Sequence, residues 1–521
     1  MRKVIFLLFL AACMPVAAQD LQVVREGCMP PPEGDVEAAA RADGMRRLPD
    51  INTTWDANRV YHQLVILISF SDTDFKGDNP REDYNRMLNE PGYNLRKGPG
   101  CAADYFKVQS RGLFNVQFDV YGPYKTSGKA QPYDNPTANT KNYGTGTMRE
   151  ATNMFLAANP DLDFSQYDWN GDGSVNQVVY VCAGLSGNQS SEACYGHIWP
   201  NTSSFSAIST PDGKKISNYS SSCELWSNGT SSCGFGTICH EYTHALGLPD
   251  IYPTSSSAGY SVVDEWDLMD GGNFTNFGWC PPNYTPLEKM LLGWLTPTEL
   301  SEPTTISNLK TAEEGGEVYI VRNTAKEYYL IENRQWKGWD SGAPGQGLVV
   351  YHVNYDASKW ASNNVNNTQG KYNFHLIAAD NMDYDAWQQY LVDSGASTQY
   401  ANNGRMNNLH LSGAPYPLLS GGEIMNNELT DSSVPASVVY NQNADGNLFM
   451  SKPITNIVNN EDGTVSFLFM GGDSIPSGIA GIGATAQHGT VAYDLTGRRT
   501  DGGRGLFIVR CQDGTIRKIV R

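Results

Sequence analysis

Residues 240–250 read HEYTHALGLPD. On a helix, His240 and His244 are four positions apart, so both imidazoles leave the same face. Two imidazoles at that spacing can bind one zinc ion, and Glu241 lies beside the first of them, where a general base for a zinc-activated water is needed. The alternative interpretation is an ordinary buried helix with two surface histidines.

The residues after the second histidine favour the metal site. Gly247 can adopt a positive φ, which lets the chain leave the helix sharply. After that turn, Asp250 could return to the metal as a third, anionic ligand. Three protein ligands leave a fourth position open for water, which is typical of a catalytic rather than a structural zinc site.

Residues 265–272 read EWDLMDGG. A methionine followed by a pair of glycines is similar to the Met-turn that underlies the zinc site of metzincin peptidases. We therefore expect Met269 to shape the floor beneath the metal without binding it. The alternative is a simple turn whose methionine packs in the core.

Oxygen-bearing side chains alternate along residues 168–176, which read DWNGDGSVN. Asp168, Asn170 and Asp172 around a glycine-rich turn are typical ligands of a hard cation such as Ca²⁺. The twelfth position of this loop is Val179 instead of the glutamate of an EF-hand, so residues elsewhere would have to complete the site. The sequence thus predicts a structural calcium site, with an Asx-rich turn as the alternative.

The chain has 521 residues, which is enough for about two to four domains. A hydrophobic fraction of 40% and an aromatic fraction of 11% indicate a folded protein rich in β structure. Prolines and acidic residues mark a linker near 296–305, and a Gly/Ala/Ser-rich stretch marks another near the C-terminus. The expected segments are 1–18 signal peptide, 19–50 pro-segment, 51–296 catalytic domain, 305–472 β-rich accessory domain, 473–489 linker and 490–521 small tail domain.

Apolar runs and alternations predict the main elements. We expect strands at 63–70, 113–121, 178–181, 317–321, 328–332, 347–353 and 465–470, and a few short strands in the tail. We expect helices at 148–158, 237–246 and 286–295. The stretch 185–235 is rich in Ser, Asn and Gly and is interpreted as surface loops around the active site.

The first eighteen residues are typical of a secretory signal, with Arg2 and Lys3 before a short apolar run. Residues 10–13, LAAC, also resemble a lipoprotein box that would attach the chain to a membrane through Cys13. The formal net charge of −18 becomes −20 when the two cations leave with the signal. So acidic a chain is not expected to bind nucleic acid or an anionic membrane surface. We expect an exported monomer with no membrane span.

Ten cysteines in an exported chain make disulfides feasible, but their pairing cannot be read from the sequence. Stapled loops and buried thiols are both open interpretations. Cys28, in the pro-segment, could cap the zinc until that segment is removed; an incidental cysteine or a disulfide partner is the simpler reading. Six cysteines lie in the stretch around the zinc motif: Cys182, Cys194, Cys223, Cys233, Cys239 and Cys280.

With these residues in hand, the chain resembles the M6 family of secreted metallopeptidases, the immune inhibitor A type, over roughly residues 55–472. The resemblance implies an α+β zincin-like (metzincin-like) catalytic domain, which we expect to be followed by an all-β sandwich-like domain. It also implies zinc-dependent proteolysis outside the cell and structural calcium. The supporting segments besides the zinc motif are 104–106 (DYF), 168–173, 268–272 and 332–334 (ENR).

The resemblance assigns His240, His244 and Asp250 as zinc ligands and Glu241 as the base. Glu265 is the alternative third ligand, since a distant glutamate serves in thermolysin-like enzymes, but the turn at Gly247 favours Asp250. The tail resembles C-terminal secretion or sorting domains of Bacteroidetes exoproteins, which would place the protein outside the outer membrane or on the cell surface.

The predicted function is that of a secreted zinc endopeptidase acting on proteins or peptides. The alternative is a non-catalytic surface protein that binds proteins or glycans on a zincin scaffold, although such a scaffold needs no Glu241. Trp336, Trp339 and Trp360 could form a sugar platform for it, but core packing explains them as readily. His352 and His375 could bind metal, with ordinary core or surface positions as the simpler explanation.

Overall fold

The computed structural model describes residues 51–473, except 97, 190, 256–261, 384, 385 and 387–410, together with four strands between residues 491 and 520. These residues fall into two compact units that divide between Asp473 and Ser474. The predicted signal peptide, Cys13 and the pro-segment with Cys28 lie outside the described residues. Within the described part, no helix combines the length and apolar character that a membrane span requires.

The first sheet has five strands in the order β2-β1-β3-β5-β4. Neighbouring strands are parallel except at one edge, where β4 runs antiparallel to β5. The strands predicted at 63–70, 113–121 and 178–181 are confirmed, with shifted ends. The strands are β1 (Val60–Ser69), β2 (Asn115–Lys125), β3 (Val178–Leu185), β4 (Asn201–Ser209) and β5 (Lys215–Leu225).

Side chains of β1 enter two different cores because they alternate between the faces of the sheet. Leu64 and Ile66 belong to the core that includes α4 (Thr145–Ala158), the helix predicted at 148–158. Val65 and Leu67 belong to the core that includes two further helices. Those helices are α2 (Pro80–Asn89) and α3 (Ala102–Gln109). Both faces of this mostly parallel sheet are therefore covered, as expected of a mixed α/β fold.

Residues 185–235 are not surface loops as the sequence predicted, because they contain β4 and β5. β5 lies between β3 and β4, and its serines at 220–222 are buried. Two of the three hydroxyl groups have hydrogen-bond partners there: Gln177 Nε2 donates to Ser220 Oγ (2.6 Å) and the Asn201 N–H donates to Ser221 Oγ (3.2 Å). The prediction was wrong because Ser and Asn usually mark turns.

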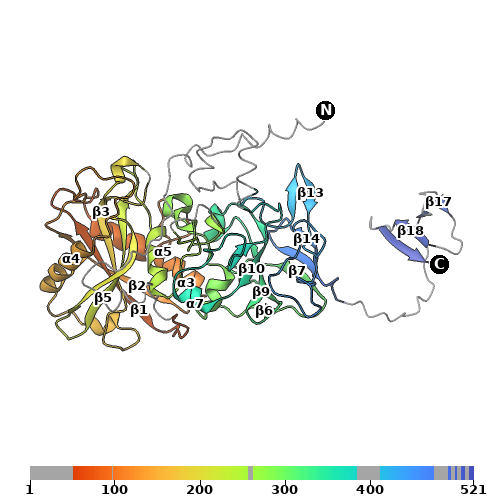
Figure 1. The fold of residues 1–521 in the computed structure, drawn as a ribbon, viewed down its shortest axis with the longest axis horizontal. Coiled ribbons are helices and arrows are strands. Elements are labelled where there is room, and N and C mark those ends of the chain that lie inside the picture. The colour runs from red at the N-terminus through yellow and green to blue at the C-terminus, as the bar shows by residue number, and fades with distance from the viewer. Residues whose placement is uncertain are drawn as a thin grey trace. The chain divides into compact units, whose positions relative to one another are not determined.

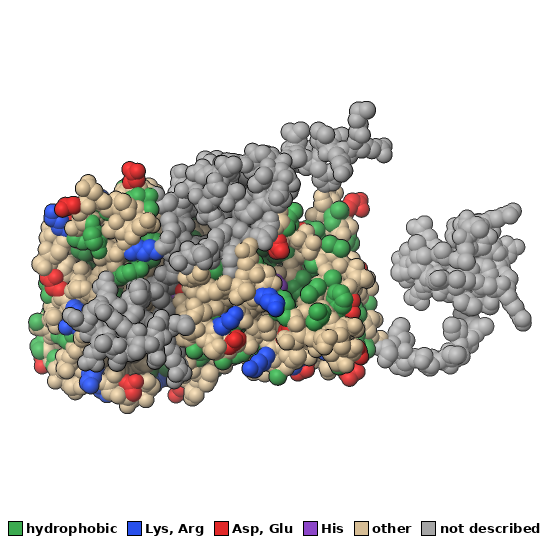
Figure 2. All heavy atoms as spheres, viewed as in Figure 1, with side chains coloured by type: hydrophobic (Ala, Val, Ile, Leu, Met, Phe, Trp, Pro, Cys, Tyr) green, Lys and Arg blue, Asp and Glu red, His purple; other side chains and the backbone are tan. Residues whose placement is uncertain are grey.

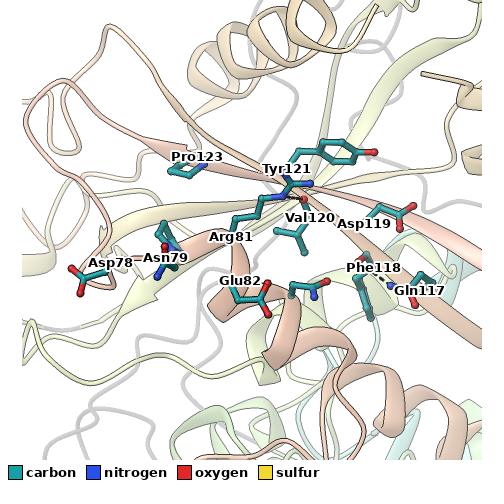
Figure 3. A pocket seen from close by; sticks show the side chains of 12 residues that line it. Asp78, Asn79, Arg81, Glu82, Gln117, Phe118, Asp119, Val120, Tyr121 and Pro123 are labelled. Carbon is teal, nitrogen blue, oxygen red and sulfur yellow. Dashed lines mark hydrogen bonds between the residues drawn. The ribbon is translucent and has the colours of Figure 1, made fainter. Parts of the chain in front are cut away.

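α2 covers part of β2, the opposite edge strand. Asn89 accepts from the Phe118 N–H and donates to the Phe118 carbonyl, both at 2.8 Å. Arg81 Nε donates to the Val120 carbonyl at 2.8 Å (Figure 3). These bonds satisfy backbone groups that an edge strand leaves open. A cavity of about 640 Å³ opens between the first turn of α2 and β2, and none of the predicted site residues lines it.

The second sheet has the order β11-β10-β9-β8-β6, and a third has the order β14-β15-β7. The strands predicted at 317–321, 328–332, 347–353 and 465–470 are confirmed. In the second sheet the bounds are β6 (Thr298–Glu299), β8 (Tyr319–Arg322), β9 (Glu327–Arg334), β10 (Gly347–Asn354) and β11 (Phe374–Leu376). The third sheet consists of β7 (Thr304–Leu309), β14 (Ile454–Asn459) and β15 (Val465–Phe469).

The second sheet also contributes to two cores. Tyr329 and Ile331 of β9 share one with the third sheet, so these two sheets pack face to face. Leu330 of β9 and Val349 of β10 share the other with β1, α2 and α3. This shared core holds side chains from both sides of residues 296–305, so a domain boundary there stays a prediction. The region predicted as all-β also contains a helix, α7 (Ala357–Ala361), and a hairpin of β12 (Leu418–Ser420) and β13 (Glu423–Asn426).

α5 (Gly236–Ala245) lies in the shared core, between the first and second sheets (Figure 1). It corresponds to the helix predicted at 237–246. The helix predicted at 286–295 ends earlier, as α6 (Pro286–Leu291). Short 3₁₀ helices join these elements: η3 (Phe164–Tyr167), η4 (Glu192–Cys194), η5 (Asp264–Trp266), η6 (Gly272–Gly278) and η7 (Gly338–Gly342).

The C-terminal unit contains a sheet of the order β17-β16-β18-β19. The short strands predicted for the tail are thus confirmed. They are β16 (Val491–Tyr493), β17 (Arg499–Thr500), β18 (Leu506–Arg510) and β19 (Ile516–Val520).

Acidic and basic side chains are interspersed over the described part of the face drawn in Figure 2. On the described part of that face neither the acidic nor the basic side chains gather into one patch.

Candidate metal centre

The helix α5 carries the motif histidines and is buried along most of its length. It begins at Gly236, where a Cβ would lie 2.1 Å from the Asn273 carbonyl oxygen, so only glycine permits this close approach to η6. The chain leaves the helix at Gly247, whose φ is +98° and whose N–H donates to the His244 carbonyl (3.0 Å). The positive φ predicted at Gly247 is confirmed.

Backbone carbonyls orient both histidines. The His240 ring donates from Nδ1 to the Leu268 carbonyl (2.7 Å), and the His244 ring donates from Nδ1 to the Leu248 carbonyl (2.8 Å). Because each Nδ1 carries the proton in this arrangement, the Nε2 lone pair of each neutral ring is available to a metal.

The turn after α5 brings Asp250 to the two rings. Its Oδ1 lies 3.2 Å from Nε2 of His240 and 3.2 Å from Nε2 of His244. One ligand atom from each of the three residues falls within 4.8 Å of the others, and among the described residues this is the group that could hold a metal. Glu265, the alternative third ligand, is not a member of it.

The electrostatics of this group fit a cation. Burial alone would raise the pKa of Asp250, but the facing rings of His244 and His240 outweigh it and hold the pKa well below its usual range. That lowering of the pKa belongs to protonated rings. When both rings are neutral and donate from Nδ1, two nitrogen lone pairs and one carboxylate oxygen converge on one point, where they would repel one another without a positive charge between them. Two imidazoles and one carboxylate are also a common ligand set for catalytic zinc.

Glu241 follows the first histidine and is held by β4. The Thr202 hydroxyl lies 3.0 Å from Glu241 Oε2 and 2.7 Å from the Glu241 carbonyl oxygen, so it can donate to either. Both residues are buried. Thr202 was missed because it lies in the stretch that the sequence predicted to be loops.

Residues of the predicted Met-turn contact the elements that carry the ligands. Leu268 is the acceptor for His240, and the Met269 carbonyl accepts from the Ile251 N–H (2.8 Å), next to Asp250. The Met269 N–H donates to Asp267 Oδ1 (2.6 Å), and the Met269 side chain is fully buried. The segment thus positions one histidine and the ligand-bearing loop through its backbone.

A residue far along the chain also contacts Asp250. Asn363 follows α7, accepts from the Asp250 N–H at 2.7 Å through Oδ1, and donates from Nδ2 to Asp250 Oδ2 at 2.8 Å. The sequence offered no signal for this contact, because it joins residues 113 positions apart.

In the predicted calcium loop, the carboxylate oxygens accept hydrogen bonds from nearby groups of the protein. Asp168 accepts from the backbone N–H groups of Asp172 and Gly173, both at 3.0 Å. Lys214 Nζ lies 2.7 Å from Asp168 Oδ2 and supplies a positive charge there. Asn170 Nδ2 donates to Asp172 Oδ2 (3.0 Å), as in an Asx-rich turn. Calcium binding at this loop stays a prediction.

The remaining candidate residues are not members of this group of three ligands. Trp339 and Trp360 are buried, whereas Trp336 is 53% exposed, so the three rings do not form one exposed platform. His352 Nε2 lies 2.9 Å from Glu327 Oε1, and its ring is 4.9 Å from that of His375. The described cysteines are buried free thiols: Cys101, Cys182, Cys194, Cys223, Cys233, Cys239 and Cys280.

Comparisons with known proteins show what the segment that carries this geometry is similar to. Residues 52–281 match the model of the immune inhibitor A peptidase M6 catalytic domain. Immune inhibitor A of Bacillus thuringiensis subsp. alesti is 28% identical over 272 residues, covering 43% of this chain and 38% of that protein. The pre-pro-metalloprotease PrtV of Vibrio cholerae serotype O1 (strain M66-2) is 22% identical over 250 residues, covering 43% of this chain and 26% of that protein.

The match thus spans well under half the length of these relatives, of which the second is named as a metalloprotease. The matched part of this chain contains α5 with its two histidines, Glu241, Asp250 and the predicted Met-turn. Over residues 52–281 the chain is thus similar to the immune inhibitor A peptidase M6 catalytic domain.

Proposed function

We propose that the chain is a zinc-dependent endopeptidase that hydrolyses peptide bonds of extracellular proteins. The observation that carries this proposal is the convergence of His240, His244 and Asp250 next to a buried glutamate, within a segment that matches a peptidase catalytic domain.

The three converging residues would hold the zinc. A zinc ion bound there would act as a Lewis acid that polarises the scissile carbonyl and lowers the pKa of the attacking water. Its ligand set of two neutral imidazoles and a carboxylate would keep a net positive charge at the site.

Glu241 is proposed as the general base. It takes a proton from the attacking water and returns it to the leaving amine. Thr202 holds the glutamate from β4, so the base does not depend on a flexible loop for its position. β4 is also an edge strand, and its backbone could pair with an extended substrate peptide.

The proposal also includes the location of the protein, a calcium ion and the oligomeric state. Residues 1–18 would direct export, with attachment through Cys13 as the alternative, and calcium would stabilise the loop at Asp168, Asn170 and Asp172. We expect a monomer.

The test is hydrolysis of casein by purified residues 19–521, with bound zinc quantified, in the presence and absence of a chelator. We expect cleavage that the chelator abolishes and that added zinc restores, with about one zinc per chain. Zinc without cleavage, even after removal of residues 19–50, would favour the non-catalytic binding protein. A chain that binds no zinc would refute the proposal.

A further inference from the structure

An asparagine-rich segment packs against the loop that carries the third ligand. We call Asn363, Asn366 and Asn367 the asparagine clamp. Asn366 Nδ2 donates to the Ile251 carbonyl at 2.9 Å, and Asn367 Oδ1 accepts from the Thr254 N–H at 2.7 Å. The Thr254 hydroxyl donates to the Asn363 carbonyl at 2.6 Å. The clamp thus contacts the loop from Asp250, the proposed third ligand, to Thr254.

Asn363 makes the contacts closest to the proposed metal. Its side chain accepts from the N–H of Asp250 and donates to Oδ2 of the same residue. With Oδ2 engaged in this way, the other carboxylate oxygen, Oδ1, faces the two imidazoles at 3.2 Å. One side chain therefore fixes both the backbone of the ligand and the direction of its carboxylate.

We propose that Asn363 is a positioning residue for the third metal ligand, so that the metal centre depends on a segment outside the matched catalytic domain. This inference rests on the proposed function. Residues that orient a metal ligand from the second coordination shell commonly change metal affinity by about 10–100-fold when they are replaced.

The fold explains why an asparagine can stand at this point. Trp360 of α7 is buried in the shared core, which anchors the helix beside the ligand loop. The chain leaves α7 through Asn363, whose φ is +53°, a conformation that asparagine tolerates better than most residues. The core shared by the two sheets therefore places the clamp, and the clamp places Asp250.

Two substitutions separate the side chain from the backbone. Asn363→Gly keeps the left-handed conformation accessible and removes both hydrogen bonds. Asn363→Asp keeps the acceptor and the shape but sets a second carboxylate against Asp250 Oδ2. The matched control is Asn456→Gly, an exposed asparagine of β14 with the same φ of +53°.

The measurement is zinc affinity of the full chain, by competition with a chromophoric chelator, together with the Tm of the zinc-free protein. We expect both Asn363 variants to bind zinc about 10–100-fold more weakly, with the control unchanged. Zinc-free Asn363→Gly should still fold, although with a lower Tm than the control because two buried groups of Asp250 lose their partner, and saturating zinc should restore most of its proteolysis.

The outcomes distinguish this inference from the proposed function. If the unaltered chain binds no zinc, both the proposed function and this inference are refuted. If the unaltered chain binds zinc and both Asn363 variants match it, the inference alone is refuted. A variant that stays folded with a lower zinc-free Tm but binds zinc as tightly as the unaltered chain would give Asn363 a purely structural role.

Discussion

The metal centre draws on two regions that differ in how far their contacts reach along the chain. α5 and the turn after it carry both histidines, Glu241 and Asp250 within eleven consecutive residues, 240–250. The described part of the β-rich region beyond residue 305 contributes no residue to the group of three ligands, yet Asn363 holds Asp250 and the second sheet completes the core around α5. The chemistry is thus local in sequence, whereas the support that holds it in place is not.

The largest expected effect tests the local region. Glu241→Gln removes the proposed base while leaving the ligands in place, so kcat/KM should fall by about 10²–10⁴-fold with zinc still bound. His240→Ala should lose zinc as well as activity. Zinc content and peptide hydrolysis are measured on the same preparations. Retained activity in Glu241→Gln would contradict the assignment of the base.

The next test is directed at the distant region. Arg334 of β9 is buried, donates to Asp340 through Nε (2.6 Å) and Nη2 (2.5 Å), and lies over the Trp266 ring beside the Met-turn. Arg334→Met leaves the Asp340 charge buried without this partner, so the free energy of unfolding should fall by about 3–5 kcal/mol.

Arg322→Met is the matched control, because Arg322 of β8 pairs with Glu299 at the surface and should cost less than about 1 kcal/mol. Chemical denaturation followed by two probes checks both variants. Because the two sheets share a core, we expect one transition in which the catalytic and β-rich regions unfold together. Two separate transitions would show that the β-rich region is an independent domain.

The same contrast explains what the sequence could predict. The spacing of the histidines, the glycine after them and the periodic strands follow from local rules, and the structure has α5, the turn at Gly247 and most strands where those rules expect them. The position of β5 between β3 and β4 involves hydrogen bonds to buried serines. The serine-rich composition of this stretch predicted loops instead. Thr202 and Asn363 reach the site through contacts between distant segments, so no local pattern marks them.

A smaller effect is expected from a carboxyl pair beneath the Met-turn. Burial raises the pKa of Glu288 to about 7, and burial beside Glu288 raises that of Asp267, which accepts from the Met269 N–H. The unfolded chain ionises Glu288 near its ordinary value of 4.5, so between about pH 4.5 and 7 the folded state holds more protons. Stability should therefore fall as pH rises through this window, by about 1–3 kcal/mol.

Glu288→Gln should reduce this dependence, because the amide does not titrate, and leave the part that comes from the buried Asp267. Unfolding curves at pH 5 and pH 7.5 check it, compared with those of the unaltered chain. A dependence that persists undiminished in the variant would assign it to other groups.

The smallest expected effect is at Thr202. The effect of its variants on peptide hydrolysis can be compared with that of the Asn363 variants. Thr202→Val keeps the β-branched shape but removes the hydroxyl that holds Glu241, so kcat/KM should fall by about tenfold, or 1.4 kcal/mol, the size of one hydrogen bond. Zinc affinity should not change, because Thr202 contacts the base rather than a ligand. Thr202→Ser, which restores the hydroxyl, should recover most of the activity.

The Asn363 variants should show the opposite pattern, with weakened zinc binding and activity that returns at saturating zinc. A Thr202→Val chain that loses zinc instead would show that the base and the metal ligands are held by one network rather than by two.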